Sequence, residues 1–270
     1  MRSSSRASHK MEENREKTAR VRVLLSAREI AAAAVMCALL LTVQYVLSFV
    51  PGVELVTALF LAFCVFFGRR CGVLTATAFS LLRCFLFGFY PNVIVLYLIY
   101  FNAFALFFGW LGERRRPVAV LVCPILLFIL AAGALALALC DLPVSKLYVG
   151  RVKGAAWAMF AVMCALGVLY GALLLARKGE RTREAAALAA LAAFFTVCFT
   201  LLDDVLTPLF YGYTWDAALA YFFTGFLAML PQTVCAAVSV ALLFPVLARI
   251  LGGVRKTTPA NVGRMHQDMV

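Results

Sequence analysis

Long runs of apolar residues, separated by short polar connections, fill most of this chain of 270 residues. A helix rises about 1.5 Å per residue, so about 20 apolar residues cross the roughly 30 Å hydrocarbon core of a bilayer. Eight runs approach that length, and each one predicts a membrane-spanning helix. They cover residues 30–50, 53–68, 72–89, 92–112, 118–140, 155–176, 185–202 and 221–248.

Basic residues follow every second run. Clusters at 2–28, 69–70, 114–116, 177–183 and 249–256, together with Arg264, hold 21 of the 25 lysines and arginines. The cytoplasmic connections of membrane proteins carry such an excess of lysine and arginine. The pattern therefore predicts an all-α polytopic membrane protein of eight spans, with both termini in the cytoplasm.

Composition agrees with this fold class and narrows the partners. With 64% hydrophobic and 14% charged residues, the chain has no room for a separate soluble domain. The net charge of +12 follows from the cytoplasmic bias, so the lipid bilayer is the expected partner and nucleic acid is not. The expected organisation is a flexible basic tail (1–29), spans one to four (30–112), a hairpin (118–176), spans seven and eight (185–251) and a second cytoplasmic tail (252–270).

Residue types that are missing from the runs limit the chemistry. Both histidines, His9 and His266, fall in the tails, which removes histidine catalysis and histidine metal ligation from the membrane interior. No lysine follows a glycine, so the chain has no Walker A loop for ATP. The nine cysteines are scattered without a CxxC pair and predict packing residues. We therefore expect no enzyme activity, no metal and no cofactor. Uphill transport would need an ion gradient or another subunit.

A few ionisable side chains lie within or beside the apolar runs, where their cost makes them candidates for function. Glu54 begins the second run, Arg83 lies in the outer half of the third, and Asp203 and Asp204 follow the seventh. With a cytoplasmic N-terminus all four share one outer depth, and Glu54 and Arg83 are expected to form a pair. Aromatic and polar residues complete the predicted substrate site, namely Tyr90, Asn92, Tyr97, Tyr100, Trp215 and Tyr221. The alternative is an aromatic belt at the membrane surface beside a purely structural ion pair.

Small residues line one face of the first run. Ala27, Ala31, Ala34 and Ala38 follow a helical spacing. A narrow face of this kind lets a second helix approach closely, either within the protein or from a partner. We therefore treat these four alanines as a candidate docking face.

The fifth and sixth runs, 118–140 and 155–176, hold no charge and are rich in alanine, leucine and valine. Gly167 and Gly171 have the spacing that permits close helix contact. This composition favours an added hairpin that packs or meets lipid over a functional core.

In their order along the chain, these features resemble the substrate-binding (S) components of energy-coupling factor (ECF) vitamin transporters. The resemblance covers the first four and the last two runs. It rests on the alanine face, Phe-Val-Pro-Gly-Val-Glu-Leu-Val-Thr at 49–57 before a short second run, and Phe-Gly at 67–68 before a basic turn. Leu-Phe-Gly-Phe at 86–89 and Tyr-Thr-Trp-Asp-Ala-Ala-Leu-Ala-Tyr at 213–221 also carry it.

The resemblance implies a six-helix bundle in the bacterial plasma membrane, with a vitamin-like substrate bound near the outer surface. It also implies that the alanine face docks on a transmembrane coupling subunit and that two cytoplasmic ATPase subunits supply energy. Two departures stand out. Residues 118–176 are expected to be an inserted hairpin, and Arg83 favours a ligand that bears a carboxylate or a phosphate.

Two other function classes remain open at this level. A stand-alone secondary transporter would move protons through Glu54 or through Asp203 and Asp204, but the chain has no clear internal repeat of the kind found in such folds. A membrane-embedded enzyme is disfavoured, because the runs lack histidine, paired catalytic carboxylates and nucleophile motifs.

Overall fold

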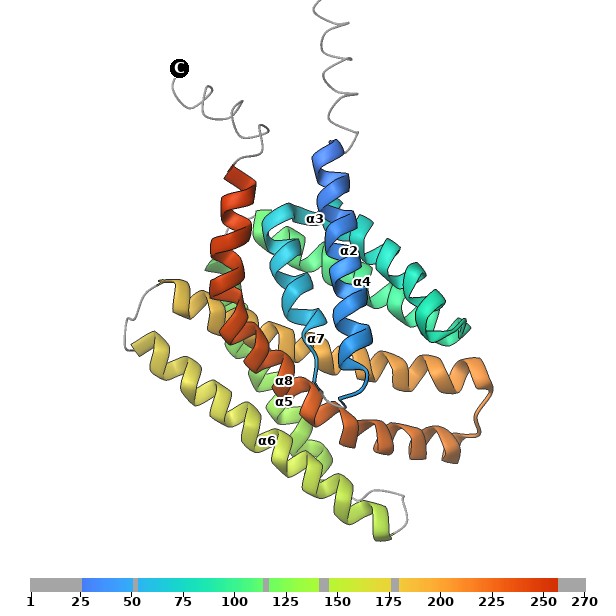
Figure 1. Cartoon of the computed structure of the whole chain (residues 1–270). Helices are drawn as coiled ribbons and strands as arrows, with labels where there is room; N and C mark the ends of the chain where they lie inside the picture. Colours follow the sequence, from blue (N-terminus) through green and yellow to red (C-terminus); the bar gives the residue numbers. More distant parts are fainter. Residues whose placement is uncertain (1–25, 51–52, 114–116, 141–145, 176–179, 257–270) are drawn as a thin grey trace, which may run out of the picture.

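The computed structural model describes residues 26–50, 53–113, 117–140, 146–175 and 180–256. Seven long helices and their short connections make up these residues, with no strand among them (Figure 1). The helices are α2 (Ala27–Leu47), α3 (Val56–Phe87), α4 (Pro91–Glu113), α5 (Pro117–Leu139), α6 (Lys146–Leu175), α7 (Glu180–Tyr211) and α8 (Trp215–Lys256). Each contains a stretch that is long and apolar enough to cross a membrane. The protein is therefore a polytopic helical membrane protein. Most of the two predicted tails lies outside the described residues.

Several helices extend beyond the apolar runs that predicted them. α7 continues past position 202, through Asp203 and Asp204, to Tyr211. α6 begins at Lys146 instead of residue 155, and α8 begins at Trp215 instead of residue 221. These ends were predicted wrongly because the backbone hydrogen bonds of a helix do not require apolar side chains. Asp203 and Asp204 consequently lie on a helix, not beyond its end.

A capping box starts α2. The Ser26 hydroxyl accepts a hydrogen bond from the Glu29 N–H at 3.2 Å, and the Glu29 carboxylate accepts one from the Ser26 N–H at 2.8 Å. These bonds satisfy backbone donors that the first turn of a helix leaves free. The helix therefore begins at Ala27, three residues before the predicted run.

Gly68 divides α3 into two segments. Its φ of 81° and ψ of −177° are not helical, and a positive φ of this kind is readily adopted only by glycine. Just after the break, the Arg69 guanidinium forms an ion pair with Glu113 at the end of α4, with 2.7 Å between Nη2 and Oε2. The second and third predicted runs thus correspond to the two segments of α3, which meet at Gly68.

Both segments of α3 lie along α4, but in opposite directions. Residues of the first segment meet progressively later residues of α4, so this segment runs parallel to it. Residues of the second segment meet progressively earlier ones, so the chain reverses direction at Gly68. The contacts are Phe60 with Phe104 and Val65 with Gly112 for the first segment, and Gly72 with Ala105 and Phe79 with Phe101 for the second.

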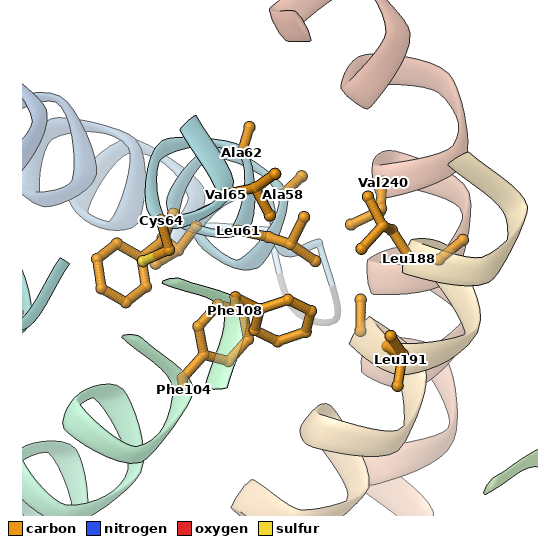
Figure 2. Packing of buried hydrophobic residues seen from close by; sticks show 14 of the residues in the cluster. Ala58, Leu61, Ala62, Cys64, Val65, Phe104, Phe108, Leu188, Leu191 and Val240 are labelled. Carbon is orange, nitrogen blue, oxygen red and sulfur yellow. The ribbon is translucent and has the colours of Figure 1, made fainter. Parts of the chain in front are cut away.

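Close packing holds the central helices together. Figure 2 shows side chains of α3 and α4, including Leu61, Phe104 and Phe108, gathered against Leu188 of α7 and Val240 of α8. Lipid tails are as apolar as these side chains, so helix association in a bilayer depends on van der Waals contact more than on the hydrophobic effect. The interlocked aromatic rings of α3 and α4 supply that contact.

One end of the molecule gathers basic residues. Glu29, beside Arg28 at the start of α2, is close enough to Cys71 to interact with it electrostatically, and Gly252 near the end of α8 faces Phe66. The start of α2, the break in α3 and the end of α8 therefore lie near one another. In Figure 1 the first residues of α2 and the last residues of α8 lie on the same side of the molecule. This arrangement agrees with two termini on one side of a membrane.

The hairpin formed by α5 and α6 buries less of its apolar surface than α3 does, as do α2 and α8. Only 28% and 24% of the apolar stretches of α5 and α6 are buried, against 67% for α3. A Cβ added at Gly167 or Gly171 would meet nothing within 4 Å. The predicted close helix contact at these glycines is therefore wrong for the part of the chain that the structure describes. Two adjoining helices exist here, and their buried small residues are alanines, including Ala134, Ala138 and Ala156, instead of these glycines.

Candidate ligand-binding site

A cavity of about 290 Å³ lies between α2, α3, α4, α7 and α8, at the end away from the basic residues. It brings together four of the predicted substrate-binding residues, Glu54, Arg83, Tyr97 and Tyr100. We call it the Arg83 cavity. Its remaining lining residues are Gln44, Leu47, Ser48, Val50, Val53, Leu55, Val56, Phe87, Phe101, Thr196, Phe199 and Gln232.

Arg83 is held in the cavity wall by two aromatic rings. Its guanidinium carbon lies 4.6 Å from the ring centroid of Phe87 and 4.2 Å from that of Tyr97. Cations are attracted to the faces of such rings. The Nε atom is buried and has no hydrogen-bond partner. Arg83 therefore presents a positive charge with unused donor capacity.

Glu54 does not pair with Arg83. Its Oε1 accepts a hydrogen bond from the Thr57 hydroxyl at 2.7 Å, and its backbone N–H lies 3.2 Å from the Cys235 sulfur. Among the described residues no carboxylate forms an ion pair with Arg83. The predicted contact is thus wrong, because Thr57 and Cys235 hold Glu54 at the start of α3 while the arginine lies over the rings. The two charges share the cavity without touching.

Gln44 adds a polar group that the sequence interpretation missed. Its Nε2 donates to the Tyr97 hydroxyl at 2.8 Å, while its Oε1 is buried without a partner. A lone glutamine within an apolar run is the same kind of signal as Arg83, and it could have been found in that way. Thr196, Phe199 and Gln232 were missed as well.

The aromatic wall of the cavity comes from two helices. The Tyr97 and Tyr100 rings of α4 meet the Phe199 ring of α7 edge to face, with centroids 5.6 and 4.8 Å apart. Phe101 lies against Tyr97 at 5.2 Å. These packed rings form an aromatic surface beside the polar groups.

Three further predicted residues form a separate cluster, which we call the Asp203 network. Both carboxylate oxygens of Asp203 accept hydrogen bonds, from the Thr207 hydroxyl at 2.7 Å and from the Tyr221 hydroxyl at 2.8 Å. Asn92 donates to the Thr207 hydroxyl at 3.0 Å, and Tyr211 donates to the Asn92 carbonyl at 3.4 Å. The network ties α4, α7 and α8 together, and none of its members lines the Arg83 cavity.

The last three predicted residues lie in neither group. Asp204 is 8% exposed and faces Gly225 of α8, and its Oδ1 has no hydrogen-bond partner. Tyr90 and Trp215 are exposed near the ends of α4 and α8 and do not line the cavity. The sequence prediction placed these residues in one site because they share a depth in the bilayer, but the packing of the helices separates them.

The candidate docking face lies on the surface of the chain. Ala27, Ala31, Ala34 and Ala38 are all exposed along α2. The opposite face of the helix, with Ala33, Met36, Cys37 and Leu40, packs into the core.

Within the described ranges, no three histidine, cysteine, aspartate or glutamate residues gather as metal ligands. The searches against protein-family models, curated proteins and solved structures found no match to this chain.

Proposed function

We propose that this protein is the substrate-binding subunit of an ECF-type importer in a bacterial plasma membrane. It captures a vitamin-like small molecule in the Arg83 cavity. A transmembrane coupling subunit and two ATPase subunits then drive its delivery.

The observation that carries the proposal is a cavity with polar groups that the protein leaves without partners. Buried polar atoms in native proteins are nearly always hydrogen-bonded, and each exception costs about 1–3 kcal/mol. Arg83 Nε and Gln44 Oε1 are two such atoms, and both residues line this cavity. A bound molecule would satisfy them and rest on the aromatic wall.

The position of the cavity supports capture from outside. Gln44 and Ser48 line it near the end of α2, whereas Arg28 lies at the opposite end of that helix. The basic end faces the cytoplasm under the positive-inside rule. The cavity is then nearest the outer surface.

The alanine face supports a partner subunit. Four small side chains leave a smooth strip on α2, and such strips allow close packing of helices within a bilayer. The face precedes the cavity residues of the same helix, the first of which is Gln44, and none of the four alanines lines the cavity. Binding and docking therefore depend on different ends of α2.

Uptake and binding measurements on α2 variants test the proposal. We expect Ala34→Trp and Ala38→Trp to abolish uptake into cells, because the indole blocks the approach of the coupling helix, while binding in detergent stays unchanged. Leu39→Trp is the matched control, since Leu39 lies at the same depth but outside the alanine face, and it should transport normally. Normal uptake by both alanine variants contradicts the docking role. Uptake by vesicles that contain this chain alone contradicts the importer proposal and supports ion-coupled transport.

A further inference from the structure

We infer that the ligand of the Arg83 cavity carries both an anionic group and a hydrogen-bond donor, preferably cationic, on one planar ring system. This inference rests on the proposed function, in that the cavity binds a small molecule. It adds the charge arrangement of that molecule.

The anionic group follows from Arg83. The guanidinium is always charged, and its Nε has no acceptor within the protein. The rings of Phe87 and Tyr97 hold its side chain in place, so little side-chain freedom remains to be lost on binding. A carboxylate or phosphate of the ligand is the natural acceptor, because charge-assisted bonds to arginine are strong and directional.

The donor follows from two acceptors on the same cavity. Gln44 Oε1 is buried without a donor, and Glu54 uses only Oε1 for its hydrogen bond from Thr57. An N–H group of the ligand, as an amine or a ring nitrogen, would supply the missing donors. A hydroxyl supplies only one hydrogen and no charge, so an amine suits Glu54 better.

Because the two charges of the cavity are separate, a ligand that carries only an acid or only an amine should bind weakly. Arg83 is the only cation among the lining residues and Glu54 the only anion, and they form no ion pair. A ligand with an acid alone would leave the Glu54 charge without a partner in a site of low polarity. A ligand with an amine alone would likewise leave the Arg83 charge without a partner. A molecule with both groups compensates each charge.

The aromatic wall of the cavity is the reason for proposing a planar ring system in the ligand. Tyr97, Tyr100 and Phe199 form connected aromatic faces and edges beside these polar groups. The volume of about 290 Å³ is at the lower end of the usual range for ligand pockets, about 300–1,000 Å³. The ligand therefore has the size of a small metabolite with one or two rings.

Matched quartets of aromatic compounds test this inference on the purified full chain. One quartet is tryptophan, indole-3-propionate, tryptamine and 3-methylindole, which carry both groups, the acid alone, the amine alone and neither. Equivalent quartets use benzene and pteridine rings. The readouts are the rise in unfolding temperature and the affinity of every compound that causes one. We expect the strongest stabilisation from compounds with both groups.

Two variants separate the contributions of the two groups. Arg83→Met should lower the affinity of the best two-group compound by about 10- to 100-fold and abolish the preference for an acid. Glu54→Gln, which keeps an oxygen for Thr57, should abolish the preference for an amine and leave the preference for an acid. Arg249→Gln removes an exposed arginine outside the cavity and should change neither.

The outcomes distinguish this inference from the proposed function. Stabilisation mainly by compounds with one group or none overturns the inference and leaves a ligand-binding cavity in place. An unchanged preference in Arg83→Met and Glu54→Gln also overturns it. If no compound of any class stabilises the protein, the proposed binding function itself is contradicted.

Discussion

The Arg83 cavity and the Asp203 network are built from similar residues but differ in whether their polar atoms have hydrogen-bond partners within the protein. In the Asp203 network, both oxygens of the carboxylate accept hydrogen bonds from side chains, at 2.7 and 2.8 Å. In the cavity, Arg83 and Gln44 each keep a buried polar atom without a partner. The first site is satisfied by the protein alone, whereas the second is incomplete.

This difference separates polar residues that complete one another within the fold from polar residues that the fold leaves without a partner. A closed network lowers the free energy of the folded chain at all times. An open one costs free energy until something binds. Changes in the two sites should therefore separate stability from binding.

The largest effect is expected from a change that damages both sites together. α4 supplies Tyr97 to the cavity and Asn92 to the network, and Gly112 sets its close approach to α3. In Gly112→Ala the new Cβ would clash with the backbone carbonyl oxygen of Val65. We expect a loss of about 4 kcal/mol or more, or failure to fold, measured by thermal unfolding in detergent. Gly167→Ala is the control and should change stability by less than about 1 kcal/mol. Equal effects of the two substitutions would contradict the packing of α3 on α4.

A smaller effect is expected when only the closed network is broken. Asp203→Ala removes the acceptor of both Thr207 and Tyr221, and each hydrogen bond to a charged group contributes about 1.5–3 kcal/mol. We expect the free energy of unfolding to fall by about 3 kcal/mol, with the affinity for a cavity ligand within about threefold of the parent. Asp216→Ala, at an exposed aspartate on α8, should cost less than about 1 kcal/mol. Lost binding with unchanged stability would instead make Asp203 part of the ligand site.

The smallest effect on stability is expected at Arg83 when no ligand is present. Arg83→Met loses the contacts with the Phe87 and Tyr97 rings but also removes a buried donor that lacks a partner. These contributions oppose each other, so we expect a change of less than about 1 kcal/mol in the ligand-free protein. Thermal unfolding after exhaustive washing measures it. A loss as large as that of Asp203→Ala would mean that Arg83 mainly holds the fold and that the comparison fails.

Hydropathy predicted most of the fold because the apolar runs and the helices coincide over most of their length. It failed where a helix continues through polar residues, as α7 does at Asp203 and Asp204. It ended the second run at Gly68, the residue where α3 breaks, but it did not give the backbone geometry of the break. Gly68 takes a backbone conformation that depends on its lack of a side chain, which run length does not reveal.

The candidate site was predicted only in part, for a related reason. The spacing of charges along a run gives the depth of a residue in the bilayer, and two pairs from that depth do lie together, Glu54 with Arg83 around one cavity and Asp203 with Tyr221 through a hydrogen bond. Which way each side chain points around its helix depends on neighbours that are remote in sequence. That direction assigns Glu54 and Arg83 to the cavity and Asp203 and Tyr221 to the network.

The reversal of α3 at Gly68 has a consequence for the order of synthesis. Because both segments of α3 pack on α4, the next helix of the chain, these parts can assemble while the ribosome is still translating the rest. The opposite wall of the cavity includes Phe199 of α7 and Gln232 of α8, which are synthesised much later. A nascent chain that ends before α7 thus lacks this wall, and only the longer chain closes the Arg83 cavity.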